Sequence, residues 1–182
     1  MSTWRRFEEA SPELASFGRD RLDDRVAYLA TGRPNGWPRV HPVSVRIREG
    51  RLFVRMDPAS PKARDLLRDG RYAMHSQVLD TSGRGGEFAI SGTARLVDDS
   101  AAVEKLERGL PDPGRYVVFE FDIEQASSTV YEGGQAVRRK WGGPSVTAPG
   151  SPQAPLMLPG GCDTVRLLDA PPNPGTGTPP NA

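Results

Sequence analysis

The chain has 182 residues, which is enough for one domain with a substantial hydrophobic core. Its formal net charge of +1 gives no reason to expect nucleic acid or an anionic membrane as a partner. A single cysteine, Cys162, excludes an internal disulfide and a metal site with several cysteine ligands. The first ten residues, MSTWRRFEEA, contain no signal-like apolar run, so we expect a cytoplasmic protein.

The first half of the chain predicts one helix followed by three strands. Ser11 and Pro12 are typical of a helix start, and the pattern predicts a helix over 12–22. Strands are predicted at 26–31, 39–48 and 51–56, with a turn at Asn35-Gly36 between the first two. Pro42 lies inside the second strand and indicates a sheet edge, a bulge or a place left open for a ligand.

The second half predicts two short helices and further strands. The helices are expected at 61–68, ending at Asp69-Gly70, and at 100–108. The strands are expected at 71–79, 87–97, 116–123, 127–131 and 135–140. Short strands joined mostly by tight turns favour a mainly β protein, with an antiparallel sheet closed into a small barrel and helices on its flank.

The composition changes after Trp141, where the folded domain is predicted to end. Ten of the eighteen prolines lie in residues 143–182, and no aromatic residue follows Trp141. We therefore expect a folded domain over 1–141 and a Pro/Gly-rich, disordered tail over 142–182. A flexible arm that binds a partner is the alternative interpretation of the tail.

The start of the helix at 61–68 has the features of an anion site. Ser60 is a favourable N-cap, and Pro61 suits the first helical position, where its missing N–H leaves no donor unpaired. Lys62 then lies beside the free N–H groups of the first turn, where the helix dipole favours negative charge. The pattern favours a phosphate-bearing ligand, and the alternative is a capped surface helix with a solvated lysine.

The strand at 39–48 carries two further candidates. The guanidinium group of Arg39 suits bidentate binding of a phosphate, and the alternative is a charge on the solvent face. His41 shares a strand face with Arg39 and Val43, because alternate residues of a strand point the same way. Its ring is expected either near the ligand or inside the barrel, and His75 has the same two interpretations. Neither histidine has a carboxylate or thiolate at ligand spacing, so no metal site is predicted.

Two charged runs have simpler interpretations. Arg64, Asp65, Arg68 and Asp69 are expected on a solvated helix face. The basic residues 138–140 are expected on a solvated terminal strand, with contact to a long anionic cofactor as the alternative.

In its order of blocks the chain resembles the pyridoxamine-5′-phosphate-oxidase-like family, the FMN-binding split barrels. The resemblance covers about residues 7–141. It rests on VAYLATGRPNGWPRVHPV at 26–43, RLFVRMDPASPKARDLLRDGRYAMHS at 51–76 and GEFAISGTARLV at 86–97. It implies an antiparallel split β-barrel that binds FMN, and a homodimer with a cofactor site at each side of the interface. Relatives on the same barrel bind a deazaflavin coenzyme or haem, so the fold alone does not identify the ligand.

The resemblance also implies positions for the cofactor-binding residues. The phosphate is expected at Arg39, Ser60 and Lys62. The flavin ring is expected between the second and third strands of one subunit and elements of the other, and further candidates belong to the partner's side or to the far end of the ring. These contacts are Val40, His41, Pro42, Val43, Ser44, Met56 and Asp57, followed by His75, Ser76, Gln77 and Glu87.

One departure from the family concerns the substrate. Pyridoxamine phosphate oxidases carry an Arg-Leu-His-type motif near the C-terminus, whereas this chain has VRRKWGG at 137–143. The prediction is therefore an FMN-dependent oxidoreductase that acts on a small organic substrate other than the vitamin B6 phosphate. The alternatives are a deazaflavin-dependent reductase and a flavin- or haem-binding module without turnover.

Overall fold

The computed structural model describes residues 3–78, 85–132 and 135–142. Its helices are α1 (Thr3–Ala10), α2 (Pro12–Leu22), α3 (Pro61–Arg68) and α4 (Ser100–Glu107). Its strands are β1 (Arg25–Gly32), β2 (Pro38–Arg48), β3 (Arg51–Met56), β4 (Arg71–Ser76), β5 (Glu87–Leu96), β6 (Val117–Glu132) and β7 (Gln135–Gly142). The predicted tail and Cys162 lie outside the described residues. No described helix is long and apolar enough to cross a membrane.

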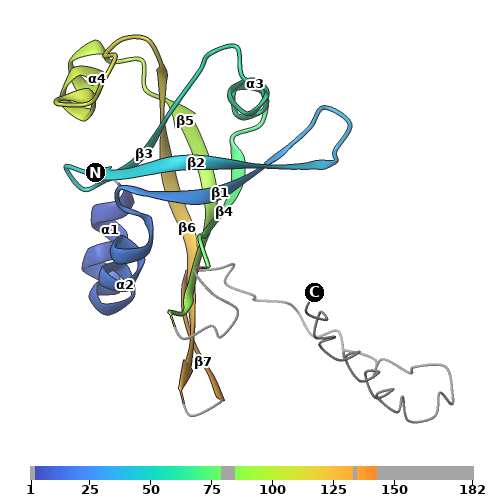
Figure 1. Cartoon of the computed structure of the whole chain (residues 1–182), viewed down its shortest axis with the longest axis vertical. Coiled ribbons are helices and arrows are strands. Elements are labelled where there is room, and N and C mark those ends of the chain that lie inside the picture. Colours follow the sequence, from blue (N-terminus) through green and yellow to red (C-terminus); the bar gives the residue numbers. More distant parts are fainter. Residues whose placement is uncertain (1–2, 79–84, 133–134, 143–182) are drawn as a thin grey trace, which may run out of the picture. The chain divides into compact units, whose positions relative to one another are not determined.

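The strands form one antiparallel sheet that closes on itself. They follow the order β3-β2-β1-β4-β5-β6-β7, and β3 also pairs with β6. Phe53 of β3 lies opposite Glu120 of β6, so the first six strands close into a barrel. β7 pairs with the second half of β6 and extends beyond the barrel (Figure 1). The predicted fold class, a small antiparallel β-barrel with flanking helices, is confirmed.

Two glycines allow the neighbours of β6 to approach its backbone closely. The pairing of β5 with β6 shifts register between Ser91 and Gly92. A Cβ at Gly92 would lie 2.1 Å from the carbonyl oxygen of Asp122. On the other side of β6, a Cβ at Gly142 would lie 1.9 Å from the Glu124 carbonyl oxygen, and Gly142 has a φ of +71°. Both close approaches require glycine.

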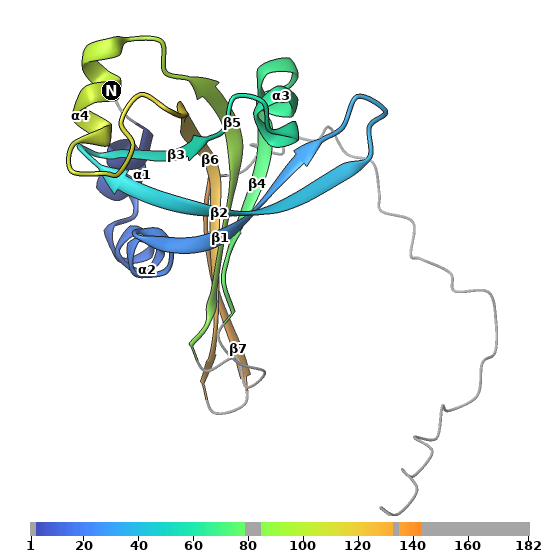
Figure 2. The same ribbon diagram turned by 45° about the horizontal axis from the view of Figure 1, so that its top comes forward.

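The core fills the barrel and the space under α1 and α2. Figure 2 shows these two helices together on one side, whereas α3 lies towards the β1–β2 hairpin. Trp4 and Phe7 of α1 are fully buried, and their rings meet edge to face with 5.4 Å between centroids. Phe7 also contacts Trp141 of β7, with a centroid distance of 4.9 Å. Helix α1 was not predicted from the sequence, and its buried aromatic residues hold it against the barrel.

Several predicted boundaries need correction. The strands predicted at 116–123 and 127–131 are one continuous strand, β6, because β5 pairs with it from Phe119 to Thr129 across the predicted break. β4 ends at Ser76 rather than residue 79. Ser11 precedes α2 as predicted, but its side chain makes no capping hydrogen bond.

Candidate functional site

The turn before α3 is built by two short side chains. The carboxylate of Asp57 accepts a hydrogen bond from the backbone N–H of Ala59 at 2.7 Å. Ser60 Oγ accepts one from the N–H of Ala63 at 3.3 Å, which confirms the predicted N-cap. Pro61 begins the helix. The side chain of Lys62 follows, half-buried, and forms no hydrogen bond or ion pair within the described part of the chain.

A buried carboxylate joins α3 to the barrel. Asp65 is 3% exposed and accepts hydrogen bonds from Thr31 Oγ1 at 3.0 Å and from Arg39 Nε at 2.9 Å. Arg68 Nη1 donates a third at 3.2 Å. Burial alone would raise the pKa of Asp65, but the hydrogen bonds from Thr31, Arg68 and Arg39 outweigh it and lower the pKa. The expectation that Asp65 lies on a solvated helix face is therefore wrong.

Arg39 and His41 lie on one face of β2, as predicted from the strand alternation. Val43 and Val45, the next residues on that face, are buried in the core. The Nε2 atom of His41 is buried and has no hydrogen-bond partner among the described residues. Burial lowers the pKa of His41, and the positive charges of Lys62 and Arg39 lower it further.

These groups form what we call the α3 cluster: Arg39, His41, Ser60, Lys62 and Asp65. Asp65, the buried carboxylate of the cluster, already bonds Arg39 and Arg68. It therefore does not balance the positive charge of Lys62. The pKa of His41 is lowered first by burial and then by the positive charges of Lys62 and Arg39, so both cations act on the ring. An orphaned imidazole nitrogen, a free ammonium group and the start of a helix fit the chemistry of an oxyanion.

Apart from Asp57, which lies in the turn before α3, the structure separates the other predicted contacts from this cluster. Val40 and Pro42 are exposed on the opposite face of β2. The side chains of Val43 and Met56 are buried in the core, which leaves only their backbone atoms for a ligand. Gln77 follows β4 and is exposed.

A pocket of about 500 Å³ lies on that opposite, outer face of the sheet. A row of paired residues on neighbouring strands forms the floor of the pocket. In this row His75 lies opposite Tyr28 on one side and Ala89 on the other. Ala89 in turn lies opposite Ser127, and Ser127 opposite Lys140. Small residues occupy much of the floor, and the larger ones stand at its rim. The lining residues are Tyr28, Ala30, Val40, Ala73, Met74, His75, Ala89, Ile90, Ser91, Gln125, Ala126, Ser127, Lys140, Trp141 and Gly142.

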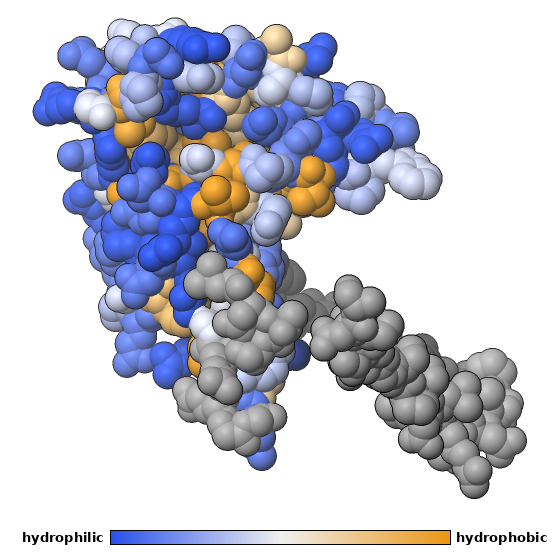
Figure 3. Space-filling view, viewed as in Figure 1, coloured by the Kyte–Doolittle hydropathy of each residue, from blue (hydrophilic) through white to orange (hydrophobic). Residues whose placement is uncertain are grey.

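Exposed apolar side chains border this pocket on β1 and β2. Val26 is 41% exposed, Tyr28 44%, Val40 61% and Trp37, in the hairpin loop, 70%. Figure 3 shows apolar patches among charged residues over these strands.

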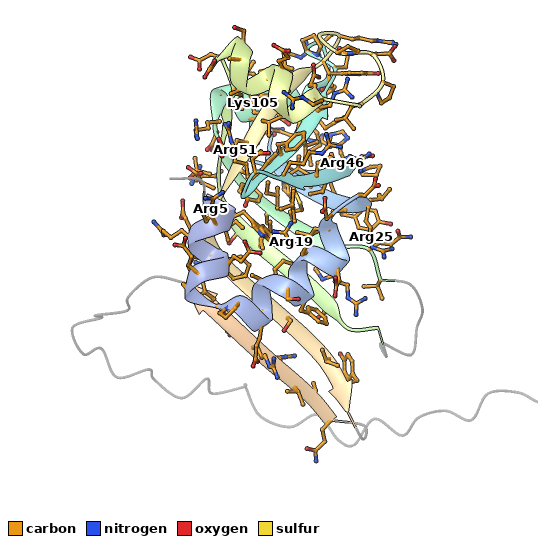
Figure 4. The ribbon with its side chains drawn as sticks, turned by 90° about the vertical axis from the view of Figure 1, so that its left-hand side faces the viewer. Arg5, Arg19, Arg25, Arg46, Arg51 and Lys105 are labelled. Atoms are coloured by element: carbon orange, nitrogen blue, oxygen red, sulfur yellow. The ribbon has the colours of Figure 1, made fainter. Side chains whose placement is uncertain are left out.

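A second set of basic residues gathers on a different face, drawn in Figure 4. It consists of Arg5, Arg19, Arg25, Arg46, Arg51 and Lys105. Three of these side chains pair with carboxylates: Arg19 with Glu8, Arg46 with Asp24 and Arg51 with Glu120. Carboxylates therefore balance half of these six charges.

No group of three or more metal-ligating side chains occurs among the described residues. The family model for pyridoxamine 5′-phosphate oxidase matches residues 13–129. No curated protein sequence matches the chain.

Solved structures share the fold at low sequence identity. Rv2991, a conserved hypothetical protein of Mycobacterium tuberculosis, is 21% identical, with a TM-score of 0.55 over 65% of this chain and 82% of that protein. PhzG of Burkholderia lata 383, solved with tetrahydrophenazine-1-carboxylic acid, is 16% identical, with a TM-score of 0.59 over 77% and 87%. A heme binding protein of Mycobacterium smegmatis is 15% identical, with a TM-score of 0.52 over 68% and 57%.

Proposed function

The chain belongs to the pyridoxamine 5′-phosphate oxidase family, and from this premise we propose that it is an FMN-dependent oxidoreductase acting on a small organic molecule. One observation carries the choice of a phosphate-bearing cofactor. The buried Nε2 of His41 has no partner in the described structure, and it lies in the field of Lys62 and Arg39 at the start of α3. A phosphate oxygen would satisfy this nitrogen and neutralise the excess charge.

Each residue of the α3 cluster would have a separate role in binding the phosphate. Lys62 and the first N–H groups of α3 supply charge and hydrogen-bond donors. Asp65 holds the Nε of Arg39, which leaves the terminal nitrogens of that guanidinium for the ligand. Ser60 fixes the helix start through its bond to Ala63. FMN, when bound, supplies hydride or single-electron transfer, whereas the protein supplies position and charge.

The substrate differs, on this proposal, from that of a true pyridoxamine phosphate oxidase. The chain has VRRKWGG at 137–143 where an Arg-Leu-His-type motif is expected. Lys140 and Trp141 of this segment line the outer pocket. We therefore place the substrate in that pocket.

We further propose a homodimer that covers the apolar side chains of β1 and β2. Val26, Tyr28 and Val40 are exposed on one sheet face, and a second copy of the same face would bury them. Light scattering coupled to size exclusion should give a dimer mass, and Val26→Asp should shift it towards the monomer. A wild-type monomer at micromolar concentration would contradict this part of the proposal.

Haem binding is the second candidate, and one observation favours it. The Nδ1 atom of His75 lies 2.7 Å from the carbonyl oxygen of Ser76, an arrangement common in histidines that bind metal through Nε2. His75 lines a largely apolar pocket.

The visible absorption spectrum of the purified full-length protein distinguishes these functions. We expect a flavin spectrum, or its appearance when FMN is added, and FMN binding should compete with inorganic phosphate. A Soret band would favour haem, and a deazaflavin spectrum would replace FMN by that coenzyme. A protein that binds none of the three would exclude the proposed function.

A further inference from the structure

His75, which lines the outer pocket, forms an ion pair with Glu87 that the phosphate site does not use. His75 is on β4 and Glu87 on β5, and their side chains are 42% and 41% exposed. His75 Nε2 lies 3.4 Å from Glu87 Oε2. His75 lines the pocket, so an occupant would contact its ring.

The backbone determines which nitrogen of His75 exchanges its proton. The carbonyl oxygen of Ser76 can only accept a hydrogen bond, so Nδ1, at 2.7 Å from it, carries a hydrogen. Nε2 is then the atom that gains or loses a proton as the ring titrates. The neutral ring of His75 therefore carries its hydrogen on Nδ1.

The contact of Nε2 with Glu87 is weak enough to be shared with a ligand. Charge-assisted hydrogen bonds between nitrogen and oxygen measure about 2.7–2.9 Å, and this contact is clearly longer. Glu87 therefore lies near Nε2 without occupying it fully. An occupant of the pocket can accept the hydrogen of Nε2.

The other charged and titratable groups around the pocket come from separate strands. Tyr28 of β1 lies opposite His75, and Lys140 of β7 lies at the far end of the same row. Lys140 supplies a positive charge that attracts an anionic occupant. Among the lining residues and their ion-pair partners, His75 is the group suited to proton exchange near neutral pH.

We propose that His75 is the proton-exchanging residue of the outer pocket, acting on a small organic molecule that carries a nitrogen or oxygen lone pair. The Nε2–H bond breaks and its electron pair stays on the imidazole, while a lone pair of the occupant forms the new N–H or O–H bond. The ring becomes neutral, Nδ1 keeps its hydrogen bond to Ser76, and Glu87 remains ionised. That the occupant is the redox substrate rests on the proposed function; the proton exchange itself does not.

The test measures the protons taken up when the full-length protein binds 4-nitrophenolate, a flat anionic probe. Titration calorimetry is run in two buffers of different ionisation enthalpy, at a mildly alkaline pH where a free imidazole is neutral. Wild type should take up about one proton per bound probe, because the complex shares a proton between Nε2 and the phenolate oxygen. His75→Gln should take up none, and Glu87→Gln should take up less than wild type.

A matched variant and a second ligand make the result decisive. Lys140→Gln should bind the probe more weakly but with the same proton uptake, since it removes charge and leaves His75 in place. Inorganic phosphate should bind His75→Gln and wild type equally, which shows that the variant is folded. Equal uptake in wild type and His75→Gln, or no probe binding by wild type, would overturn the proposal. Normal uptake in a protein that binds no FMN would overturn the proposed function alone.

Discussion

Two buried carboxylates in this molecule each bond two arginines, yet only one of them lies in a candidate site. Asp65, on α3, bonds Arg39 and Arg68. Glu120, on β6, is 1% exposed and forms a two-bond pair with Arg51, at 2.9 and 2.6 Å. Arg95 donates to the same carboxylate at 2.5 Å.

The difference lies in what surrounds each carboxylate. Glu120 links β3, β5 and β6 where the barrel closes, and its bonds raise the pKa of Arg51. Beside Asp65 stand Lys62 and the buried Nε2 of His41, neither of which has a partner in the described structure. A buried carboxylate that bonds two arginines is therefore explained by a structural role alone. Polar groups without partners next to such a carboxylate indicate, in addition, a ligand-binding site.

The largest expected effect comes from the structural carboxylate. Glu120→Ala should lower the free energy of unfolding by about 3 kcal/mol or more, because it leaves Arg51 without its partner in the barrel wall. Urea unfolding measures this loss. Arg95→Ala, whose side chain is 57% exposed, should cost less than about 1 kcal/mol. If folded Glu120→Ala also lost phosphate binding, the two carboxylates would not be functionally distinct.

At the α3 cluster the expected effect is on affinity. Lys62→Ala should weaken FMN binding roughly 10- to 100-fold, since a hydrogen bond to a charged group contributes about 1.5–3 kcal/mol. Fluorescence titration measures it. Arg64→Ala is the matched control, because Arg64 is exposed, whereas Arg68 bonds Asp65 and the Gly32 carbonyl oxygen. Equal FMN affinities of Lys62→Ala and Arg64→Ala would contradict a phosphate site at Lys62.

The loss of folding stability at acid pH should depend more on Asp65 than on its neighbour Asp69. The pKa of Asp65 lies below its ordinary value of 3.8, so its ionised form stabilises the fold above that value. This contribution is lost as the pH falls through the lowered pKa, and Asp65→Asn should flatten the acid limb of the stability curve.

Asp69 is the control for that experiment. Hydrogen bonds from Arg71 lower the pKa of Asp69 to about 2, but this carboxylate is exposed and its partner is two residues away. The pair can persist in the unfolded chain, so Asp69→Asn should change the acid limb less. A larger effect from Asp69→Asn would contradict the role given to Asp65.

The smallest expected effect is on His41. Burial and the nearby cations lower its pKa, so a bound anion should raise it again. NMR titration of the imidazole with inorganic phosphate should show this rise, and phosphate affinity should increase by less than about tenfold as the pH falls through the histidine range. A pKa of His41 that phosphate does not change would place the anion elsewhere.

Local patterns predicted the parts of the site that depend on neighbouring residues. Ser60, Pro61 and Lys62 start α3 as expected, because an N-cap bonds an N–H only three residues away. The alternation of β2 likewise placed Arg39 and His41 on one face.

The rest depends on contacts that the local pattern does not contain. Asp65 looks like part of a charged surface run, and only Thr31 and Arg39, more than twenty residues earlier, explain its burial. The outer pocket escaped prediction for the same reason, since strand pairing brings Tyr28, His75 and Lys140 into one row.

The pairing of β3 with β6 also has a consequence for synthesis of the chain. Residues 53–56 of β3 find their partners only at 117–120, whereas β1, β2 and β3 follow one another directly. Sequence-distant pairing carries a larger loop-closure cost, so this seam should form late in folding. Until β6 has left the ribosome, β3 presents an open edge, and the nascent chain is then most prone to aggregate.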